Sequence, residues 1–240
     1  MLTVSELRTY LSQETSTQMF IQTTHRLDTI RVNIDIDMPY MPCDVIGVDV
    51  EDSVGNHIQD YYGELHKHRI DADGKNINIE TWKEKNENRR VILDKIKREL
   101  KEEQGCRIEG FIDVVRVPGN FHISHHAFRD ILQALERDGI KLDNSFKINH
   151  LSFGQKTDME SIARRFPDTD LKHTLDGFEM EKSKKDLSKH MRVGFFLNAV
   201  PSEFEADHGV GDIFTTEAFQ LTSSYEIDND YGEDVIFFNF

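Results

Sequence analysis

Residues 105–128 read GCRIEGFIDVVRVPGNFHISHHAF, and the rest of the chain is organised around this segment. Apolar residues at every second position predict a strand over residues 107–117. Pro118-Gly119-Asn120 predicts a turn after it. Ser124 is a candidate cap for a following helix, which Gly139 would end. The segment therefore predicts a strand, a reversal and a helix in succession.

The same period of two is found at residues 30–36, and further strands are expected on both sides of this segment. Proline cannot donate a ladder hydrogen bond, so Pro201 is expected to end one of these strands. Many strands with few helices predict a mainly β fold, a β-sandwich of antiparallel strands with a few peripheral helices. The expected strands lie at residues 30–36, 45–50, 58–70, 145–153, 192–200, 213–223 and 234–240.

Residues 1–240 are expected to form a single domain with three less regular parts. Residues 1–24 have the spacing of a lead-in helix that docks on the domain edge. Residues 82–104, rich in lysine and glutamate, predict an amphipathic helix inserted between strands rather than a core element. Residues 155–190 are polar and predict a long exposed excursion with weak helix.

Charge and hydropathy exclude some classes of protein. The net charge is −15 with histidine counted as neutral, and so acidic a chain is repelled by nucleic-acid phosphates. We therefore expect no nucleic-acid partner. No run of about 18 apolar residues and no signal-peptide pattern is found, which on its own indicates the cytosol.

The chain has only two cysteines, Cys43 and Cys106, and no Cys-x-x-Cys motif. In a reducing compartment they would be two buried thiols. In an oxidising one they could form a bridge, which would close a loop of about 60 residues and stabilise the fold by roughly 4 kcal/mol. The residues alone leave both possibilities open.

The densest histidine cluster is formed by His122, His125 and His126. Residues 122 and 126 would share a helical face suitable for a metal, but the turn before Ser124 breaks that spacing, which favours surface or structural histidines. Histidine also changes charge at mildly acidic pH, so a pH-sensing role is a third interpretation. Hydrolase motifs and a P-loop are missing from the sequence, so we predict no catalytic residue, no metal and no cofactor.

The segment from Gly105 resembles the Erv/ERGIC family of ER–Golgi vesicle proteins. That family has a Gly-Cys-x-x-x-Gly strand followed by a Val-Pro/Ser-Gly-Asn-Phe-His turn. Residues 33–43 and 148–154 resemble two further motifs of the family. Residues 198–202 resemble another motif more weakly, and residues 235–240 resemble the family's last strand. The matching positions are Pro42, Gly105, Cys106, Gly110, Val117, Gly119, Asn120, Phe121, His122, Asn149, Ser152, Phe153, Gly154 and Pro201.

The resemblance implies a lumenal domain between two transmembrane helices that this chain does not contain, with both chain ends close together and facing the membrane. It places the domain on the lumenal side of the ER, the ER–Golgi intermediate compartment and the cis-Golgi. An oxidising lumen favours the Cys43–Cys106 bridge. The charged segment 82–104 stands where one branch of the family has a cysteine-rich segment, so the chain is more similar to the cysteine-poor branch.

The resemblance also implies a function. Family members cycle in COPII and COPI vesicles, form hetero-oligomers with a paralogue, and retrieve escaped ER-resident proteins with binding that responds to pH. We therefore expect a non-enzymatic cargo receptor, with His122, His125 and His126 as candidate pH-sensing or binding residues. Coats and membrane would be contacted by parts outside this chain. The alternatives are an architectural subunit that stabilises a partner receptor, and a metal- or glycan-dependent hydrolase on a β-sandwich.

Overall fold

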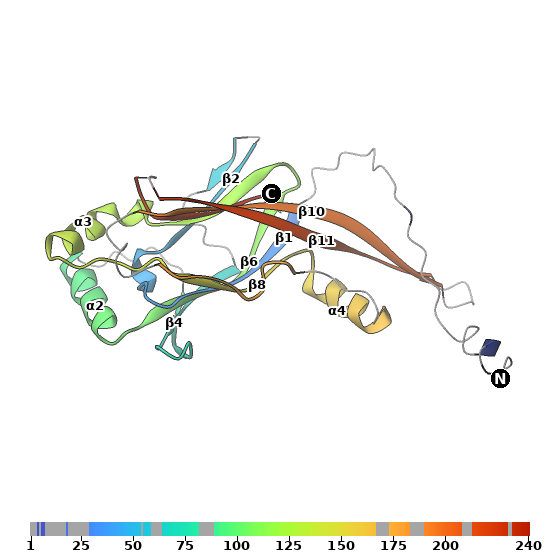
Figure 1. Ribbon diagram of the computed structural model, residues 1–240, viewed down its shortest axis with the longest axis horizontal. Helices are drawn as coiled ribbons and strands as arrows, with labels where there is room; N and C mark the ends of the chain where they lie inside the picture. Colours follow the sequence, from blue (N-terminus) through green and yellow to red (C-terminus); the bar gives the residue numbers. More distant parts are fainter. Residues whose placement is uncertain are drawn as a thin grey trace.

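The computed structural model describes two six-stranded sheets packed face to face, with short helices at the periphery (Figure 1). This confirms the predicted mainly β sandwich. The described residues are 29–53, 55–58, 64–81, 89–166, 173–182, 190–207, 213–229 and 232–240, together with residues 4, 6, 7 and 18. In this part of the chain, no helix is long and apolar enough to cross a membrane.

Each sheet collects strands from distant parts of the sequence. Sheet A has the order β5 (Asn76–Thr81), β4 (Glu64–Ile70), β6 (Gly105–Val115), β1 (Thr29–Met38), β8 (Phe146–Phe153) and β9 (Phe178–Met180). Sheet B has the order β11 (Ile213–Asp228), β10 (Arg192–Asp207), β12 (Val235–Asn239), β7 (Gly119–Ser124), β2 (Gly47–Asp52) and β3 (His57–Ile58). The paired strands are antiparallel except β10 and β12, which run parallel.

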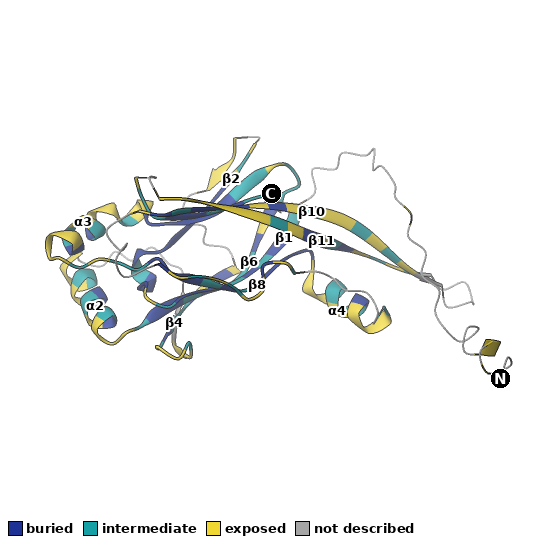
Figure 2. Ribbon diagram, viewed as in Figure 1, coloured by how far each residue is buried: buried dark blue, intermediate teal, exposed yellow. Residues whose placement is uncertain are grey.

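The hydrophobic core lies between the two sheets (Figure 2). Alternation along β1 turns Val32, Ile34 and Ile36 inward and its polar residues outward. The core's aromatic part is a stack in sheet B, where Phe238 lies between Phe121 and Phe195 with ring centroids 4.5 and 5.0 Å away. The segments that resemble family motifs thus contribute directly to the core.

The helices gather at the ends of the sandwich (Figure 1). α2 (Arg89–Lys101) and α3 (Arg129–Arg137) lie at one end, and α4 (Lys156–Arg165) lies toward the other. The expectation that residues 82–104 form no part of the core was wrong for the apolar side of α2. Ile96 is fully buried there, and buried Glu99 pairs with Arg69 of β4 at 3.1 Å. Residues 82–88 are outside the described part.

The predicted cap at Ser124 was wrong. Ser124 is the last residue of β7, where it pairs with Gly47 of β2, so the sheet ladder holds it in extended backbone. The helical region begins later, with the 3-10 turn η2 (His126–Phe128), and α3 follows it. α3 ends at Arg137, and Gly139 follows with a φ of +74°, as the expected helix stop requires.

The expectation that Pro201 ends its strand was also wrong, because β10 continues to Asp207. Parallel pairing with β12 stops at Phe196, so from Leu197 onward β10 is hydrogen-bonded in the sheet only to β11. A proline is tolerated where one side of a strand has no ladder partner. The β10–β11 hairpin extends beyond the sandwich as a two-stranded ribbon (Figure 1).

Three boundary expectations also changed. Cys43–Val45 is a short 3-10 turn, η1, so the second strand starts at Gly47. The region expected as one strand over residues 58–70 contains β3 and β4, which belong to different sheets. Residues 155–190 contain α4, with Ile162 fully buried, and the edge strand β9.

Some expectations fall on residues outside the described part. The lead-in helix over residues 1–24 is one of them, since only residues 4, 6, 7 and 18 are described there. The expected closeness of the two chain ends also depends on residues outside the described part. The same holds for most of the segment 183–190.

Candidate functional site

The two cysteines form a disulfide, as the resemblance implied. Cys43 in η1 is bridged to Cys106 in β6, 63 residues along the chain, and both are buried. Pro42 precedes the bridge, and its carbonyl accepts the Val45 amide at 3.2 Å to close the turn. The disulfide therefore joins the connection between the sheets to the middle of sheet A, and its part is structural.

Two of the motif segments meet side by side on β1 and β8. Asn33 donates to Ser152 Oγ and to the Gly154 carbonyl, both at 3.0 Å. Asn149 donates to Asp35 Oδ1 at 3.0 Å. Phe153 points into the core. These residues hold the centre of sheet A in register.

The motif glycines lie where another backbone comes close. A Cβ on Gly110, whose φ is +137°, would stand 2.0 Å from the Glu64 carbonyl oxygen. At Gly119 and Gly105 the nearest backbone oxygens would be 2.6 and 2.5 Å away. These motif positions therefore fix the close approach of neighbouring segments.

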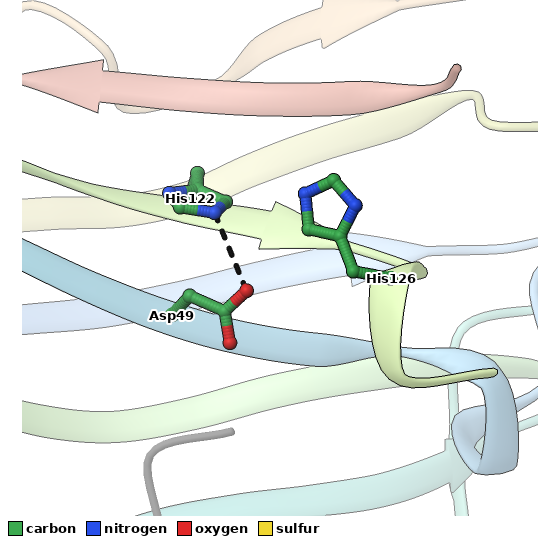
Figure 3. A group of neighbouring side chains, drawn as sticks. All are labelled: Asp49, His122 and His126. Atoms are coloured by element: carbon green, nitrogen blue, oxygen red, sulfur yellow. Dashed lines mark ion pairs between the residues drawn. The ribbon is translucent and has the colours of Figure 1, made fainter. Parts of the chain in front are cut away.

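The candidate site of sheet B consists of Asp49, His122 and His126 (Figure 3). Pairing of β2 with β7 sets Asp49 directly opposite His122, and His122 Nε2 lies 3.3 Å from Asp49 Oδ2. The turn η2 folds His126 back, so that its ring centroid is 5.8 Å from that of His122. One ligand atom from each residue lies within 4.8 Å of the others.

Hydrogen bonds orient both rings of this site. His122 Nδ1 donates to Asn120 Oδ1 at 3.0 Å, and His126 Nδ1 donates to Glu233 Oε2 at 2.9 Å. Ser124 Oγ lies 3.3 Å from Asp49 Oδ2. Because Nδ1 of each ring is engaged outside the group, Nε2 is the nitrogen that each histidine offers within it.

The structure corrects the membership of the predicted histidine cluster. His125 turns inward and donates from Nδ1 to the Val45 carbonyl at 2.6 Å. Burial lowers the pKa of His125, against smaller opposing effects from that hydrogen bond and from Asp234. Asp49 takes its place, and His122 and His126 are joined by a strand and a turn rather than by a helix. The sequence signal for Asp49 was its position between Val48 and Val50 in a strand.

A second polar group covers the outer face of sheet A, which we call the polar face. It contains Asp35 and Asp37 of β1, Arg107 and Glu109 of β6, His66 and His68 of β4, and His150 of β8. His68 Nε2 lies 3.6 Å from a Glu109 oxygen. His150 Nδ1 donates to Asp176 at 2.8 Å, and its ring centroid lies 5.0 Å from that of His173. The register shift in β8 between its pairs with Asp35 and Ile36 hid His150 from a simple alternation pattern.

Burial raises the pKa of Asp35 above its usual range, while Asn149 and Arg107 act in the opposite direction. A raised pKa means that the native state binds the proton more tightly than the unfolded chain. The free energy of unfolding therefore falls as pH rises through the interval from the ordinary aspartate pKa up to the raised one.

Asp35→Asn should remove this penalty and raise the free energy of unfolding at neutral pH. The amide oxygen can still accept from Asn149, and Arg107 keeps its pair with Asp37 at 2.6 Å. Urea unfolding of both proteins from neutral pH to about pH 4 measures the effect. A gain that stays constant with pH would contradict the titration of Asp35 as its source.

Comparison with known proteins agrees with these observations. The family model "Endoplasmic reticulum vesicle transporter" matches residues 74–240, and the model "Endoplasmic Reticulum-Golgi Intermediate Compartment (ERGIC)" matches residues 1–59. The chain is 25% identical over 210 residues to endoplasmic reticulum-Golgi intermediate compartment protein 1 of Xenopus laevis, which covers 87% of this chain and 56% of that protein. The corresponding protein of Danio rerio is 24% identical over 206 residues, with 85% and 55% covered.

This chain thus spans about half the length of the curated relatives it matches. The solved structure titled "Crystal Structure of Erv41p" superposes with a TM-score of 0.52 at 19% identity, covering 90% of this chain and 92% of that one, and shows the shared fold. The relatives are ER–Golgi transport proteins, which places this chain in the ER, the ER–Golgi intermediate compartment and the Golgi. Because the first model alone covers more than half of the chain, the protein belongs to the endoplasmic reticulum vesicle transporter family.

Proposed function

We propose that this chain is the lumenal domain of a receptor that cycles between the ER and the Golgi, without enzymatic activity, and that it binds protein cargo and a paralogous partner. Family membership supports the cycling. The disulfide supports a lumenal position, because such bridges persist in oxidising compartments. Flanking membrane helices would carry the contacts with the membrane and the coats.

The observation that carries the cargo-binding proposal is the set of histidine–carboxylate pairs on the polar face. His150 faces Asp176, His173 and, across the β1–β8 pair, Asp35. Histidine is the side chain whose charge changes between near-neutral and mildly acidic pH. A change of charge at His150 would be accessible to a binding partner, because about a third of this side chain is exposed to solvent.

Strand β4, which is separated from β8 by β6 and β1, carries two more histidines on the polar face. His66 and His68 face Glu109 and Arg107 of β6, and His66 is exposed. A proton gained by any of these histidines would make the polar face more positive as pH falls. We infer that the face binds carboxylate-bearing surfaces of escaped ER proteins more tightly in the acidic Golgi and releases them in the near-neutral ER.

A pH-sensing or binding role for His122, His125 and His126 stays a prediction. His125 is the least suited of the three, because it is buried and this burial lowers its pKa, which disfavours the charged form. The polar face was not predicted as a site from the sequence.

The test is capture of ER-resident proteins by the receptor with its membrane helices restored, at near-neutral and mildly acidic pH. We expect stronger capture at the acidic pH, and loss of most of this difference in a His66→Gln, His68→Gln, His150→Gln variant. His57→Gln, an exposed histidine on β3 of the other sheet, is the matched control and should behave as wild type. Capture that does not change with pH, or a triple variant that keeps the full response, would contradict the proposal.

An architectural role is a second candidate, because β10 exposes apolar side chains. Phe196 and Val200 are 45% and 47% exposed and lie on one face of the strand, and Phe196 lines a shallow depression together with Asn198, Thr222 and Ser224. We propose that the paralogous partner docks here. Under this architectural role, co-purification of the partner should be lost with Phe196→Ser/Val200→Ser, and the chain without its partner should capture no cargo at either pH. Retained partner binding would rule this surface out.

A further inference from the structure

The Asp49–His122–His126 group lies outside the polar face and has no part in the cargo binding proposed for sheet A. It lies on the outer face of sheet B, away from the polar face, and its two strand residues are nearly buried: the side chains of His122 and Asp49 are 7% and 8% exposed. The Phe237 ring flanks His122 at 4.8 Å between centroids. We propose that Asp49, His122 and His126 bind one divalent transition-metal ion, with zinc as the best match.

The hydrogen-bond directions show why a cation is needed there. Asn120 Oδ1 is an acceptor, so His122 Nδ1 must carry the hydrogen that joins them. A neutral His122 then has its lone pair on Nε2, and this atom lies 3.3 Å from an oxygen of the Asp49 carboxylate. Two acceptors at this distance repel each other unless a cation is shared between them. A bound metal ion supplies that cation, and a proton is the competing possibility.

The spacing suits a zinc ion. Ligand atoms about 2.0–2.1 Å from a tetrahedral zinc lie about 3.3–3.4 Å from one another. The measured His122–Asp49 separation is 3.3 Å, and the whole ligand group lies within 4.8 Å, so small side-chain rotations bring His126 to the same spacing. Imidazole nitrogen and carboxylate oxygen are both established zinc ligands, and imidazole favours zinc over magnesium or calcium.

The surrounding residues form the outer layer that zinc sites usually have. Metal-bound histidines generally donate their second ring N–H to a carboxylate or carbonyl, which fixes the tautomer. Here His126 donates to the Glu233 carboxylate and His122 to the Asn120 amide oxygen. Ser124 Oγ lies within hydrogen-bond distance of Asp49 Oδ2. Each of the three ligands therefore already has a partner that orients it.

Three protein ligands leave a fourth tetrahedral position for water or for an atom of a bound partner. His126 is the more open side of the group, since its side chain is 35% exposed. The metal proposal is independent of the receptor proposal, because it concerns what the isolated chain binds and requires neither cargo nor pH-dependent capture.

The test uses the whole 240-residue chain, without a histidine tag and with its disulfide formed. After treatment with a chelator, zinc is titrated against a chromogenic competitor, and bound metal is counted by elemental analysis. We expect one zinc per chain and a rise in melting temperature on loading. Cobalt should give the intense visible absorption of a tetrahedral site. Less than stoichiometric zinc at concentrations that load the competitor would overturn the proposal and leave the proton as the shared cation.

Variants assign the ligands. His126→Gln, which removes a partly exposed side chain, should weaken zinc binding more than about 100-fold, because even changes to orienting partners cost about 10–100-fold. Glu233→Gln should fall within that smaller range and leave the stoichiometry unchanged. His66→Gln on sheet A is the matched control and should bind as wild type. Unchanged affinity in His126→Gln, with a melting curve that shows a folded protein, would exclude this group as the site.

Discussion

Replacing Cys43 and Cys106 together with alanine should lower the free energy of unfolding by about 4 kcal/mol. The bridge spans 63 residues, so without it the unfolded chain recovers a large loop entropy. Alanine is the suitable replacement because both side chains are buried and a serine hydroxyl would need a new partner. Urea unfolding monitored by circular dichroism, with and without reductant, measures the change.

The reduced wild type provides the control for this prediction. It should unfold at nearly the same urea concentration as the double alanine variant, because both lack the loop constraint while keeping similar packing. If reduction leaves the midpoint of the wild type unchanged, the bridge contributes little to stability. A sharply lower midpoint in the alanine variant than in the reduced wild type would instead assign the loss to packing at the two side chains.

Gly110→Ala should destabilise the domain by more than about 3 kcal/mol. The φ of +137° is unfavourable for any residue with a Cβ, and the added carbon would stand 2.0 Å from the Glu64 carbonyl oxygen. That oxygen belongs to backbone and cannot rotate away, so β4 and β6 must separate where Leu65 pairs with Gly110. Hydrogen exchange should report the loss first in β4 and β5, which lie beyond β6 in the sheet.

Gly74→Ala is the matched control. Gly74 also has a positive φ, +76°, but a Cβ there would meet nothing within 4 Å. This change should cost only the backbone strain of about 1–2 kcal/mol. Equal losses in the two variants would show that backbone strain alone, rather than the close approach of β4, explains the requirement for glycine at position 110.

The sequence predicted the strands and turns that depend on a local alternation of apolar and polar residues or on a local glycine or proline. Val32, Ile34 and Ile36 alternate with polar residues, and the same alternation recurs in β6, so the mainly β sandwich could be predicted without knowledge of the strand order. The motif residues Asn33, Asn149 and Ser152 could be singled out by their resemblance to a family, which also implied the disulfide. The hydrogen bonds that these residues make across β1 and β8, from Asn33 to Ser152 and from Asn149 to Asp35, could not be predicted from the sequence.

The errors share one cause, which is that a strand's neighbours decide what its residues do. Ser124 is a good helix cap by residue type, but pairing with Gly47 keeps it in the sheet. Pro201 breaks a strand in general, and β10 tolerates it because β12 no longer pairs there. Ile96 lies on the apolar side of a helix rich in charged residues and reaches the core because α2 packs against the end of the sandwich.

The sequence by itself therefore determined the fold class, the family and the two cysteines of the bridge, because these depend on local period, composition and recognisable segments. Tertiary structure alone decided which polar side chains stand together. It removed His125 from the histidine group and brought in Asp49, some 73 residues before His122, because antiparallel pairing of β2 with β7 makes them direct neighbours. It also assembled the polar face from four strands. Contacts of this kind depend on strand order and register, which are set by the packing of the whole sandwich rather than by any single segment.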